Sequence, residues 1–360
     1  MQRVLITGGH LSPALAIVDE LVTKKDCEII FVGRKHAFVE KKSLSLEYRL
    51  MKKYRQVQFF EFESGRLTRG QYWRLPYEFW LLNKALYQAY KLLRTEEPTQ
   101  IISFGSYLAF PICLAASWLK IPIYLHEQTV IPGATNRKLA KYAKIIFVSF
   151  PESVPYFPIN KTVVSGIPLK DRLDKKQMPN WLKPTKKPLL LVLGGSTGSH
   201  SLNLLLEKNL AELTKKWQIV HQIGQNQFQD YERLSQHSTP DYYPRDFIIP
   251  EQIPYLYQQS KIVVSRSGAN TFFELVYFKK PAVLIPLPWS ASQEQQKQAA
   301  ILEQAEVAKI FNQDSPNQQF LTAINEVYQH KSEYQANYIK LKKYADLVVK
   351  PEAILRQIFT

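Results

Sequence analysis

The sequence predicts two open α/β domains, each built around a parallel, doubly wound sheet. The chain has 360 residues, which is too long for one ordinary core. Short apolar runs alternate with helical patterns in both halves. A glycine turn follows a buried apolar run in each half, at residues 7–10 and 194–198. Ligands bind such sheets at the carboxyl ends of the strands, so we expect binding sites beside these two turns.

The predicted elements divide the chain into four parts. Apolar runs in the first half predict strands at residues 3–6, 27–32, 101–104, 121–125, 145–149 and 162–164. Those in the second half predict strands at residues 189–193, 217–222, 247–249, 262–265 and 282–285. A charged, proline-dotted stretch separates the two sets. The predicted parts are an N-terminal domain at 1–164, a linker or hinge at 165–188, a C-terminal domain at 189–340, and a final helix at 341–360 that packs back on the first domain.

The composition is that of a globular protein with a strongly basic surface. Lys and Arg number 47 against 31 Asp and Glu, which gives a formal net charge of +16. This excess favours a nucleic acid, an acidic membrane surface or a phosphorylated substrate as partner, although it also serves general solubility. Cys27 and Cys113 have neither CxxC nor Cys/His spacing. We therefore expect buried, reduced thiols in a cytosolic protein and no metal site.

One apolar segment has nearly the length of a membrane span. It covers residues 107–125, but Lys120 and two prolines interrupt it. We predict a buried helix at 111–119 and a short strand at 121–125 instead of a span. The apolar run at the N-terminus is too short for a signal peptide, so we do not expect secretion.

The region from Gly65 to Lys91 combines basic and aromatic residues. A basic loop at 65–70 precedes aromatic and cationic residues at near-helical spacing, which are Trp73, Arg74, Tyr77, Phe79, Trp80, Lys84, Tyr87, Tyr90 and Lys91. Trp and Tyr favour the membrane–water boundary and Lys and Arg are drawn to anionic lipid, so one interpretation is a face that docks on an anionic membrane. The alternative is an amphipathic helix packed on its own sheet with a solvated basic side. Such interleaving also occurs in proteins that bind single-stranded nucleic acid, but no recognisable module accompanies it, and we expect no nucleic-acid partner.

Two turns in the second half are suited to binding phosphate. Each joins a buried strand to a helix, and together they contain Gly194, Gly195, Ser196, Arg266, Ser267 and Gly268. Glycine lets the backbone approach a ligand, and the first N–H groups of a helix lack partners within it. The alternative is that these glycines serve only packing. Glu274, on the helix after the second turn, is a candidate for binding a ribose diol.

Polar residues at strand ends in the first half are candidates for binding a second substrate. His10 follows the turn of Gly8 and Gly9, and an imidazole can accept a proton from a hydroxyl nucleophile. The segment after the strand predicted at 121–125 supplies five more polar residues, which are His126, Glu127, Gln128, Thr129 and Asn136. Helix capping by Asn136 and a structural salt bridge for Glu127 are the alternatives.

Seven stretches make the chain resemble the MurG family of glycosyltransferases. They are TGGHLSPALA at 7–16, SGRLTRG at 64–70, SFGSYLAFP at 103–111, HEQTVIPGATNRKLAK at 126–141, LGGSTGSHSLN at 193–203, SRSGANTFFEL at 265–275 and EQQKQA at 294–299. They occur in the family's order across nearly the whole chain. The resemblance implies the GT-B fold, in which two Rossmann-like domains face each other across a cleft. It also implies an inverting enzyme without metal or cofactor that moves N-acetylglucosamine (GlcNAc) from UDP-GlcNAc to the MurNAc 4-hydroxyl of lipid I, giving lipid II for peptidoglycan synthesis.

The resemblance also implies roles for individual residues. The residues that would bind the UDP-sugar are Lys170, Gly194, Gly195, Ser196, Arg266, Ser267, Gly268, Glu274, Gln295 and Gln298. The residues that would bind the undecaprenyl-linked acceptor are Gly8, Gly9, His126, Gln128, Thr129 and Asn136. His10 and Glu127 would be catalytic, with His10 as the general base; the alternative is that His10 only positions the acceptor diphosphate. The family works as a peripheral protein on the cytoplasmic face of the membrane, where residues 65–91 would dock.

Several positions depart from the family pattern. The first glycine turn is shorter than the usual GGTGGH, which puts binding of the acceptor diphosphate in doubt. Thr129 and Gln298 stand where asparagine is usual, and His200 stands where arginine is expected. Ile167 and Lys170 replace the asparagine and arginine of a GNPxR-type hinge. These departures keep two alternatives open: a related enzyme with another lipid acceptor, such as diacylglycerol, and a nucleotide-sugar-binding protein without activity.

Overall fold

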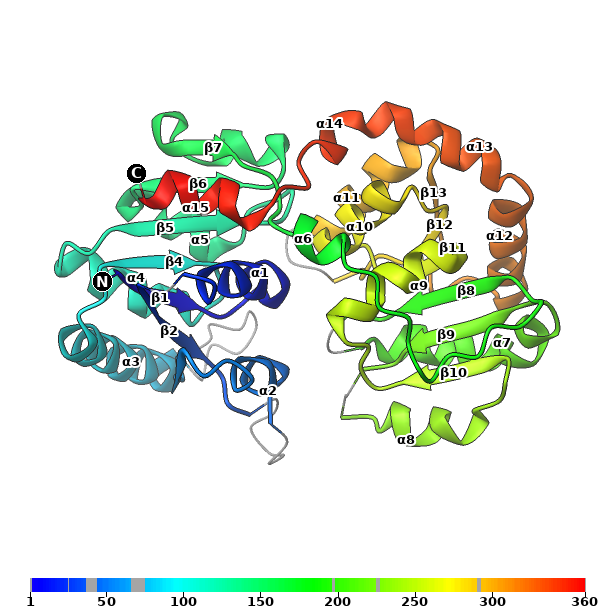
Figure 1. The fold of residues 1–360 in the computed structure, drawn as a ribbon, viewed down its shortest axis with the longest axis horizontal. Helices are drawn as coiled ribbons and strands as arrows, with labels where there is room; N and C mark the ends of the chain where they lie inside the picture. Colours follow the sequence, from blue (N-terminus) through cyan, green and yellow to red (C-terminus); the bar gives the residue numbers. More distant parts are fainter. Residues whose placement is uncertain are drawn as a thin grey trace. The chain divides into compact units, whose positions relative to one another are not determined.

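The chain folds into two compact units. The computed structural model describes residues 2–24, 26–36, 44–65, 75–195, 198–224, 227–289 and 293–359 (Figure 1). Unit 1 comprises Met1–Leu169 and Val349–Thr360, and unit 2 comprises Lys170–Val348. The last helix of the chain therefore belongs with the first unit.

Unit 1 contains a parallel sheet of seven strands in the order β3-β2-β1-β4-β5-β6-β7. The strands are β1 (Gln2–Thr7), β2 (Cys27–Gly33), β3 (Val57–Glu61), β4 (Gln100–Ser103), β5 (Ile123–Glu127), β6 (Ile145–Val148) and β7 (Thr162–Val164). The α-helices are α1 (Leu11–Leu21), α2 (Leu46–Met51), α3 (Leu75–Glu96), α4 (Ala109–Trp118), α5 (Ala134–Leu139) and α15 (Pro351–Phe359).

Helices cover both faces of this sheet because its strands are apolar on both sides. Leu5 packs in the same cluster as α3 and α4, whereas its neighbours Val4 and Ile6 pack with α1 and α15. Side chains alternate between the faces of a strand, so a strand buried on both faces is a continuous apolar run. The hydroxyl of Tyr124 on β5 donates a hydrogen bond of 3.2 Å to the carbonyl of Ile358, which fastens α15 to the sheet (Figure 1).

Unit 2 contains a parallel sheet of six strands in the order β10-β9-β8-β11-β12-β13. The strands are β8 (Leu189–Leu193), β9 (Gln218–Gln222), β10 (Tyr242–Arg245), β11 (Ser260–Ser265), β12 (Ala282–Leu284) and β13 (Ala308–Ile310). The α-helices are α6 (Lys170–Leu173), α7 (His200–Lys216), α8 (Asp230–Leu234), α9 (Ile253–Gln259), α10 (Ala269–Phe278), α11 (Glu294–Gln304), α12 (Asn317–Gln329), α13 (Lys331–Ala336) and α14 (Lys342–Ala345).

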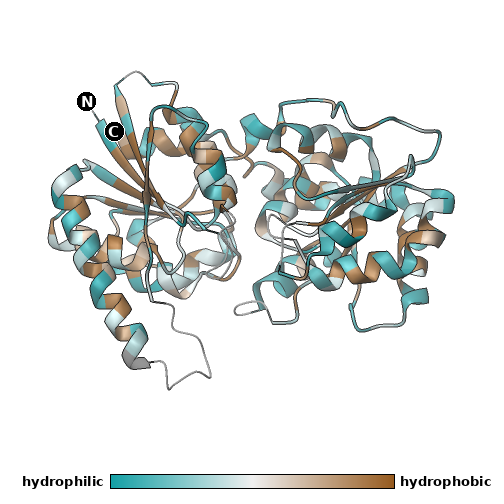
Figure 2. Ribbon diagram, turned by 90° about the horizontal axis from the view of Figure 1, so that it is seen from below, coloured by the Kyte–Doolittle hydropathy of each residue, from teal (hydrophilic) through white to brown (hydrophobic). Residues whose placement is uncertain are grey.

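The same layering holds in unit 2. Leu190 and Val192 of β8 pack with α7 and α12, while α9 contacts β8 and β11. Figure 2 shows hydrophobic colouring along the strands of both sheets and hydrophilic colouring on much of the outer helical surface. The predicted fold class is therefore confirmed: each unit is a parallel, doubly wound α/β domain.

One predicted strand is wrong. Residues 247–249 are not a strand, and β10 lies earlier, at Tyr242–Arg245. Pro244 hid this strand, because a proline within a run argues against a sheet interior. β10 is an edge strand of its sheet, where proline is tolerated. β3 and β13, two other short strands, were not predicted.

The segment at 107–125 forms a helix and a strand, as predicted. α4 ends at Trp118 and β5 begins at Ile123. None of the helices in the described part of the chain is long and apolar enough to cross a membrane. Cys27 and Cys113 are both buried and unpaired. The charged stretch at 170–188 belongs with unit 2, where Leu173 and Leu182 are buried.

The strand order places one topological switch point in each sheet. In unit 1, β1 lies between β2 and β4, and in unit 2, β8 lies between β9 and β11. The chain leaves the central strand toward opposite sides at these points, which opens a crevice at the strand ends. Both glycine turns of the sequence follow these central strands.

Candidate functional site

The glycine turn of unit 1 packs closely against the turn that follows β4. Gly9 has φ +148°, and a Cβ at this position would lie 2.9 Å from Cβ of Ser106 and 3.0 Å from the carbonyl oxygen of Gly105. Gly105 and Ser106 themselves have φ values of +81° and +70°. No side chain fits at Gly9, and the glycine brings the two turns together.

His10 is held by a backbone carbonyl at the start of α1. Its Nδ1 lies 2.9 Å from the carbonyl oxygen of Phe104, at the end of β4. A carbonyl only accepts hydrogen bonds, so Nδ1 carries the proton and Nε2 of the neutral ring presents a lone pair. The ring is partly exposed. This tautomer suits His10 to accept a proton from a hydroxyl group.

The amides of Gly8 and Gly9 already have partners within unit 1. The N–H of Gly8 donates to the carbonyl of Val32 at 2.7 Å, and the N–H of Gly9 donates to Oε1 of Glu47 at 3.1 Å. Oε2 of Glu47 also accepts from the N–H of Arg34 at 3.3 Å, and burial raises the pKa of the Glu47 carboxyl. A carboxylate from α2 thus occupies the position that the sequence assigned to a substrate phosphate. No sequence motif pointed to Glu47.

His126 is buried at the end of β5. It is 1 % exposed, and its Nε2 lies 3.2 Å from the carbonyl oxygen of Gly166. Burial lowers the pKa of His126 to about 4, so the ring is neutral at physiological pH. Its ring lies 5.4 Å from that of Phe104, whose carbonyl holds His10. His126 therefore supports the base of the site from below.

Glu127 organises the loop that leads into α5. The carboxylate is 1 % exposed. Oε1 accepts from the N–H and the hydroxyl of Thr129 at 2.9 and 2.7 Å. Oε2 accepts from the N–H of Gly133 and from Nδ2 of Asn136, both at 3.0 Å. Four donors saturate the carboxylate, so its geometry is that of a residue that positions others.

Two predicted acceptor-binding residues keep an oxygen without a partner among the described residues. They are Gln128, whose Oε1 is buried, and Asn136, whose Oδ1 is buried. Asn136 lies beside the β4 exit turn, because a Cβ on Gly105 would come within 3.3 Å of its Nδ2. Unit 1 therefore brings His10, Ser106 and Asn136 to one edge of its sheet.

In unit 2, the turn after β8 also requires its glycines. Gly195 has φ +87°, with nothing within 4 Å of a Cβ placed on it. A Cβ on Gly198 would lie 2.0 Å from the carbonyl oxygen of Ile223, so only glycine fits there. The turn has open space on one side and tight packing on the other. Ser196, which was predicted to bind the diphosphate, lies outside the described residues.

The turn after β11 starts α10 beside the turn after β8. Gly268 is the N-cap of α10, and a Cβ placed on it would meet nothing within 4 Å. The hydroxyl of Ser267 donates to the carbonyl of Gln295 at 2.8 Å, which ties α11 to this turn. The side chain of Arg266 points inward and is 5 % exposed. Lys170, at the start of α6, is exposed.

Two further residues predicted to bind the donor are polar groups that lie in the interior. Burial raises the pKa of Glu274 to about 7, and its Oε2 accepts from the hydroxyl of Tyr257 at 2.8 Å. Gln298 on α11 is fully buried, yet neither polar atom of its amide has a partner among the described residues. Unsatisfied buried amides are rare and indicate a partner supplied from outside the fold. Gln295, one turn earlier, accepts from the N–H of Leu287 at 3.1 Å.

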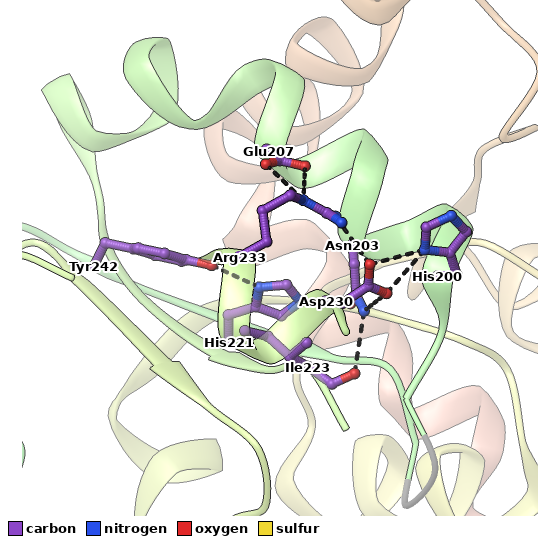
Figure 3. Close-up of polar contacts among 8 residues, drawn as sticks. All are labelled: His200, Asn203, Glu207, His221, Ile223, Asp230, Arg233 and Tyr242. Carbon is purple, nitrogen blue, oxygen red and sulfur yellow. Dashed lines mark hydrogen bonds and ion pairs between the residues drawn. The ribbon is translucent and has the colours of Figure 1, made fainter. Parts of the chain in front are cut away.

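His200, where the family has arginine, heads a polar network beneath α7. Its Nδ1 lies 2.8 Å from Oδ1 of Asp230, which is fully buried, and its ring stacks on Phe228 at 3.9 Å (Figure 3). Asn203 and Arg233 donate to the same carboxylate at 2.8 and 2.9 Å. Beyond Asp230, the network continues through Glu207, His221 and Tyr242 (Figure 3). Sequence reasoning missed Asp230 because it comes 30 residues after His200.

No group of three or more His, Cys, Asp or Glu side chains in the described ranges is arranged to hold a metal ion.

Comparison with known proteins covers the whole chain. The glycosyltransferase family 28 N-terminal domain matches residues 7–148, and the C-terminal domain of that family matches residues 189–350. The UDP-N-acetylglucosamine--N-acetylmuramyl-(pentapeptide) pyrophosphoryl-undecaprenol N-acetylglucosamine transferase of Clostridium botulinum (strain Langeland) is 30% identical over 353 residues, which is 95% of each chain.

Solved structures agree with this match. The crystal structure of Acinetobacter baumannii MurG has a TM-score of 0.67 and 25% identity, over 99% of each chain. The spinosyn rhamnosyltransferase SpnG, complexed with thymidine diphosphate, has a TM-score of 0.68 at 15% identity over the whole of both chains, which shows the shared GT-B fold. The chain therefore belongs to glycosyltransferase family 28 and, within it, to the MurG family.

Proposed function

We propose that the protein transfers GlcNAc from UDP-GlcNAc to the 4-hydroxyl of MurNAc in lipid I, which gives lipid II for peptidoglycan synthesis. The observation that carries this proposal is the 30% identity, over 95% of both chains, with a transferase named for that reaction. Both glycine turns of the family are present at the switch points of the two sheets.

The chemistry is a single displacement at the anomeric carbon. The acceptor hydroxyl oxygen forms a bond to C1 of GlcNAc while the bond from C1 to the phosphate oxygen breaks, which inverts the configuration. The hydroxyl proton passes to Nε2 of His10, and UDP leaves with the bonding electron pair. The hydrogen bond from Nδ1 to the Phe104 carbonyl leaves Nε2 free to accept that proton.

In unit 2, the amino ends of α7 and α10 hold the donor diphosphate through backbone N–H groups. Glu274 binds the ribose diol with the carboxylate oxygen that Tyr257 leaves free. Gln298 gives its unpartnered amide to the sugar hydroxyls, with Gln295 beside it. The residues assigned to the donor are Lys170, Gly194, Gly195, Ser196, Arg266, Ser267, Gly268, Glu274, Gln295 and Gln298.

In unit 1, the acceptor binds at the edge where β1, β4 and β5 end. Asn136 and Gln128 offer free oxygens to it. Gly8, Gly9, His126 and Thr129 shape this edge, and Glu127 acts by fixing the loop at 127–136. His10 is the catalytic base.

The aromatic surface of α3 docks on the membrane that holds the lipid acceptor. Ala85, Ala89 and Leu93 face the core of unit 1. Phe79 and Trp80 on the outer side are 67% and 56% exposed. The exposed residues around them are Tyr77, Lys84, Tyr87, Tyr90, Lys91 and Arg94. Exposed aromatics among cations fit the headgroup region of anionic lipid, which places the protein peripherally on the cytoplasmic face. Residues 66–74 of the predicted docking region lie outside the described residues.

Replacing Phe79 and Trp80 together by serine is expected to reduce sedimentation with phosphatidylglycerol vesicles by about tenfold, because two large apolar contacts are lost. Trp289→Ser is the matched control, since Trp289 is 71% exposed in unit 2. Sedimentation with anionic and with neutral vesicles measures the effect. Equal binding by the double variant and the unaltered protein would exclude α3 as the docking surface.

Glu274→Gln is expected to weaken donor binding and to stabilise the fold above neutral pH. A carboxyl whose folded pKa is raised from 4.5 to about 7 destabilises the fold progressively as pH rises through that window, and glutamine removes this loss. Ionised Glu274 accepts from the ribose diol, so the donor KM of the unaltered protein falls as pH rises through 7. The variant's KM stays about tenfold higher and does not follow pH. Kinetics and thermal unfolding between pH 6 and pH 8 test both effects; equal KM values at pH 8 would remove Glu274 from the ribose site.

The proposal is tested by release of UDP from a panel of substrates. UDP-GlcNAc, UDP-Gal and UDP-Glc are each supplied with a lipid I analogue, with diacylglycerol, or with no acceptor. We expect UDP release from UDP-GlcNAc only when the lipid I analogue is present. Turnover with diacylglycerol alone would favour the alternative acceptor, and binding of UDP-GlcNAc without any turnover would favour a non-catalytic binding protein.

A further inference from the structure

The guanidinium of Arg266 is buried among neutral groups. Its Nε donates to the hydroxyl of Ser199 at 2.8 Å, one terminal nitrogen donates to the carbonyl of Ile285 at 2.7 Å, and the other donates to Oε1 of Gln313 at 3.0 Å and to the hydroxyl of Ser201. Four of its five N–H donors are thus used, and each partner is uncharged. The side chain is fixed without any compensation of its charge.

No carboxylate in the described part of the chain forms an ion pair with Arg266. Arg233 in the same unit pairs with both Glu207 and Asp230, although it is far more exposed. Burial lowers the pKa of Arg266 to about 10, because the charged form is separated from water. A buried charge without a partner is costly, and proteins keep one where a ligand supplies the opposite charge.

The cation lies at the switch point of the unit 2 sheet. Arg266 directly follows β11, and its partner Ser199 is the N-cap of α7. The Ser199 hydroxyl accepts from Arg266 and does not cap α7, and α10 also lacks a side-chain cap. The first N–H groups of both helices are therefore left for a ligand, beside Gly195 and Gly268, where a Cβ would meet nothing within 4 Å.

We propose that Arg266 is a buried counter-charge for the donor diphosphate, and that Ser199, Ser201 and Gln313 are positioning residues that hold it without neutralising it. This inference rests on the proposed function, since the diphosphate is that of the UDP-sugar. Arg266 attracts the diphosphate through the field that it adds to the ends of α7 and α10, while the backbone amides make the contacts. The same field stabilises the charge that UDP acquires when the bond from C1 to its phosphate oxygen breaks.

A purely structural role for Arg266 makes the opposite prediction for one variant. Gln313→Glu places a carboxylate at hydrogen-bond distance from the guanidinium. An ion pair there strengthens the strut, so under either role the fold becomes more stable or stays unchanged. A strut that only supports the turn would then bind UDP at least as well. A counter-charge that has been neutralised would bind UDP less well.

The experiment compares calorimetric binding of UDP and of uridine, which lacks phosphate, to the full chain. For Gln313→Glu we expect UDP affinity to fall at least about tenfold, uridine affinity to stay unchanged, and the thermal midpoint to stay level or rise. Gln313→Ala removes the hydrogen bond without adding charge and loses less UDP affinity than Gln313→Glu. Gln318→Glu adds the same charge on the exposed side of α12 and leaves both affinities within about twofold.

Arg266→Lys and Arg266→Met extend the test in case Gln313→Glu does not fold. The lysine keeps the charge and retains most UDP affinity, whereas the methionine loses UDP affinity and keeps uridine affinity. Unchanged UDP binding by Gln313→Glu or Arg266→Met, or an equal loss of uridine binding, would overturn the counter-charge. An unaltered protein that binds uridine but gains nothing from the diphosphate would overturn it as well, and one that binds neither ligand would contradict the proposed donor itself.

Discussion

His10→Ala is expected to lower kcat by about 10²- to 10⁴-fold, the usual contribution of a general base. The hydrogen bond from Nδ1 to the Phe104 carbonyl fixes the tautomer whose Nε2 accepts the acceptor proton. Alanine removes that lone pair and leaves the glycine turn intact. Because His10 lies in unit 1, UDP affinity should stay within about twofold of the unaltered value. Steady-state kinetics and calorimetric titration with UDP measure the two quantities.

The control for this experiment is His237→Ala. His237 is exposed in unit 2 and takes part in neither proposed binding site. Its replacement should leave kcat and UDP affinity unchanged. A loss of less than about threefold in kcat for His10→Ala would show that His10 only positions the acceptor, and another group would then take the proton.

Glu127→Ala is expected to destabilise unit 1 by at least about 3 kcal/mol. The carboxylate satisfies the backbone N–H groups of Thr129 and Gly133 and the amide of Asn136, all within one buried loop. Each buried donor left without a partner costs roughly 1–3 kcal/mol. The measurement is the free energy of unfolding in urea. Glu63→Ala, at an exposed position of the same unit, should change it by less than about 0.5 kcal/mol.

Glu127→Gln separates a positioning role from a catalytic one. Whichever carboxylate oxygen becomes an NH₂ group then faces an N–H donor, either that of Thr129 or that of Gly133. We therefore expect this isosteric change to destabilise the fold as well. A variant that folds with full stability but has no activity would show that Glu127 acts directly on the acceptor.

The central strands of the fold could be predicted because their signals are local. Leu189 to Leu193 form an uninterrupted apolar run between Pro188 and Gly194, and β8 has those bounds. A parallel strand buried on both faces needs such a run, so composition alone identifies it. The edge strand β10 has no such run, and Pro244 within it pointed away from a strand.

The partners of the site residues could not be predicted, because they depend on which strands become neighbours. Phe104 meets His10 only because β4 pairs with β1, across 94 residues of sequence. Glu47 reaches the amide of Gly9 from a helix 38 residues later. Glu127 resembled a catalytic acid because it ends a strand. Its role became visible only with the positions of the amides that saturate it.

The most direct test of the account is whether the purified protein builds a disaccharide on a lipid carrier. It is incubated with UDP-GlcNAc and a lipid I analogue in anionic vesicles, and the lipid fraction is analysed by mass spectrometry. We expect a lipid product heavier by one N-acetylhexosamine, with UDP released in equal amount, and almost none of this product with His10→Ala. Absence of that product from the unaltered protein, under conditions where it binds UDP-GlcNAc, would contradict the proposed reaction.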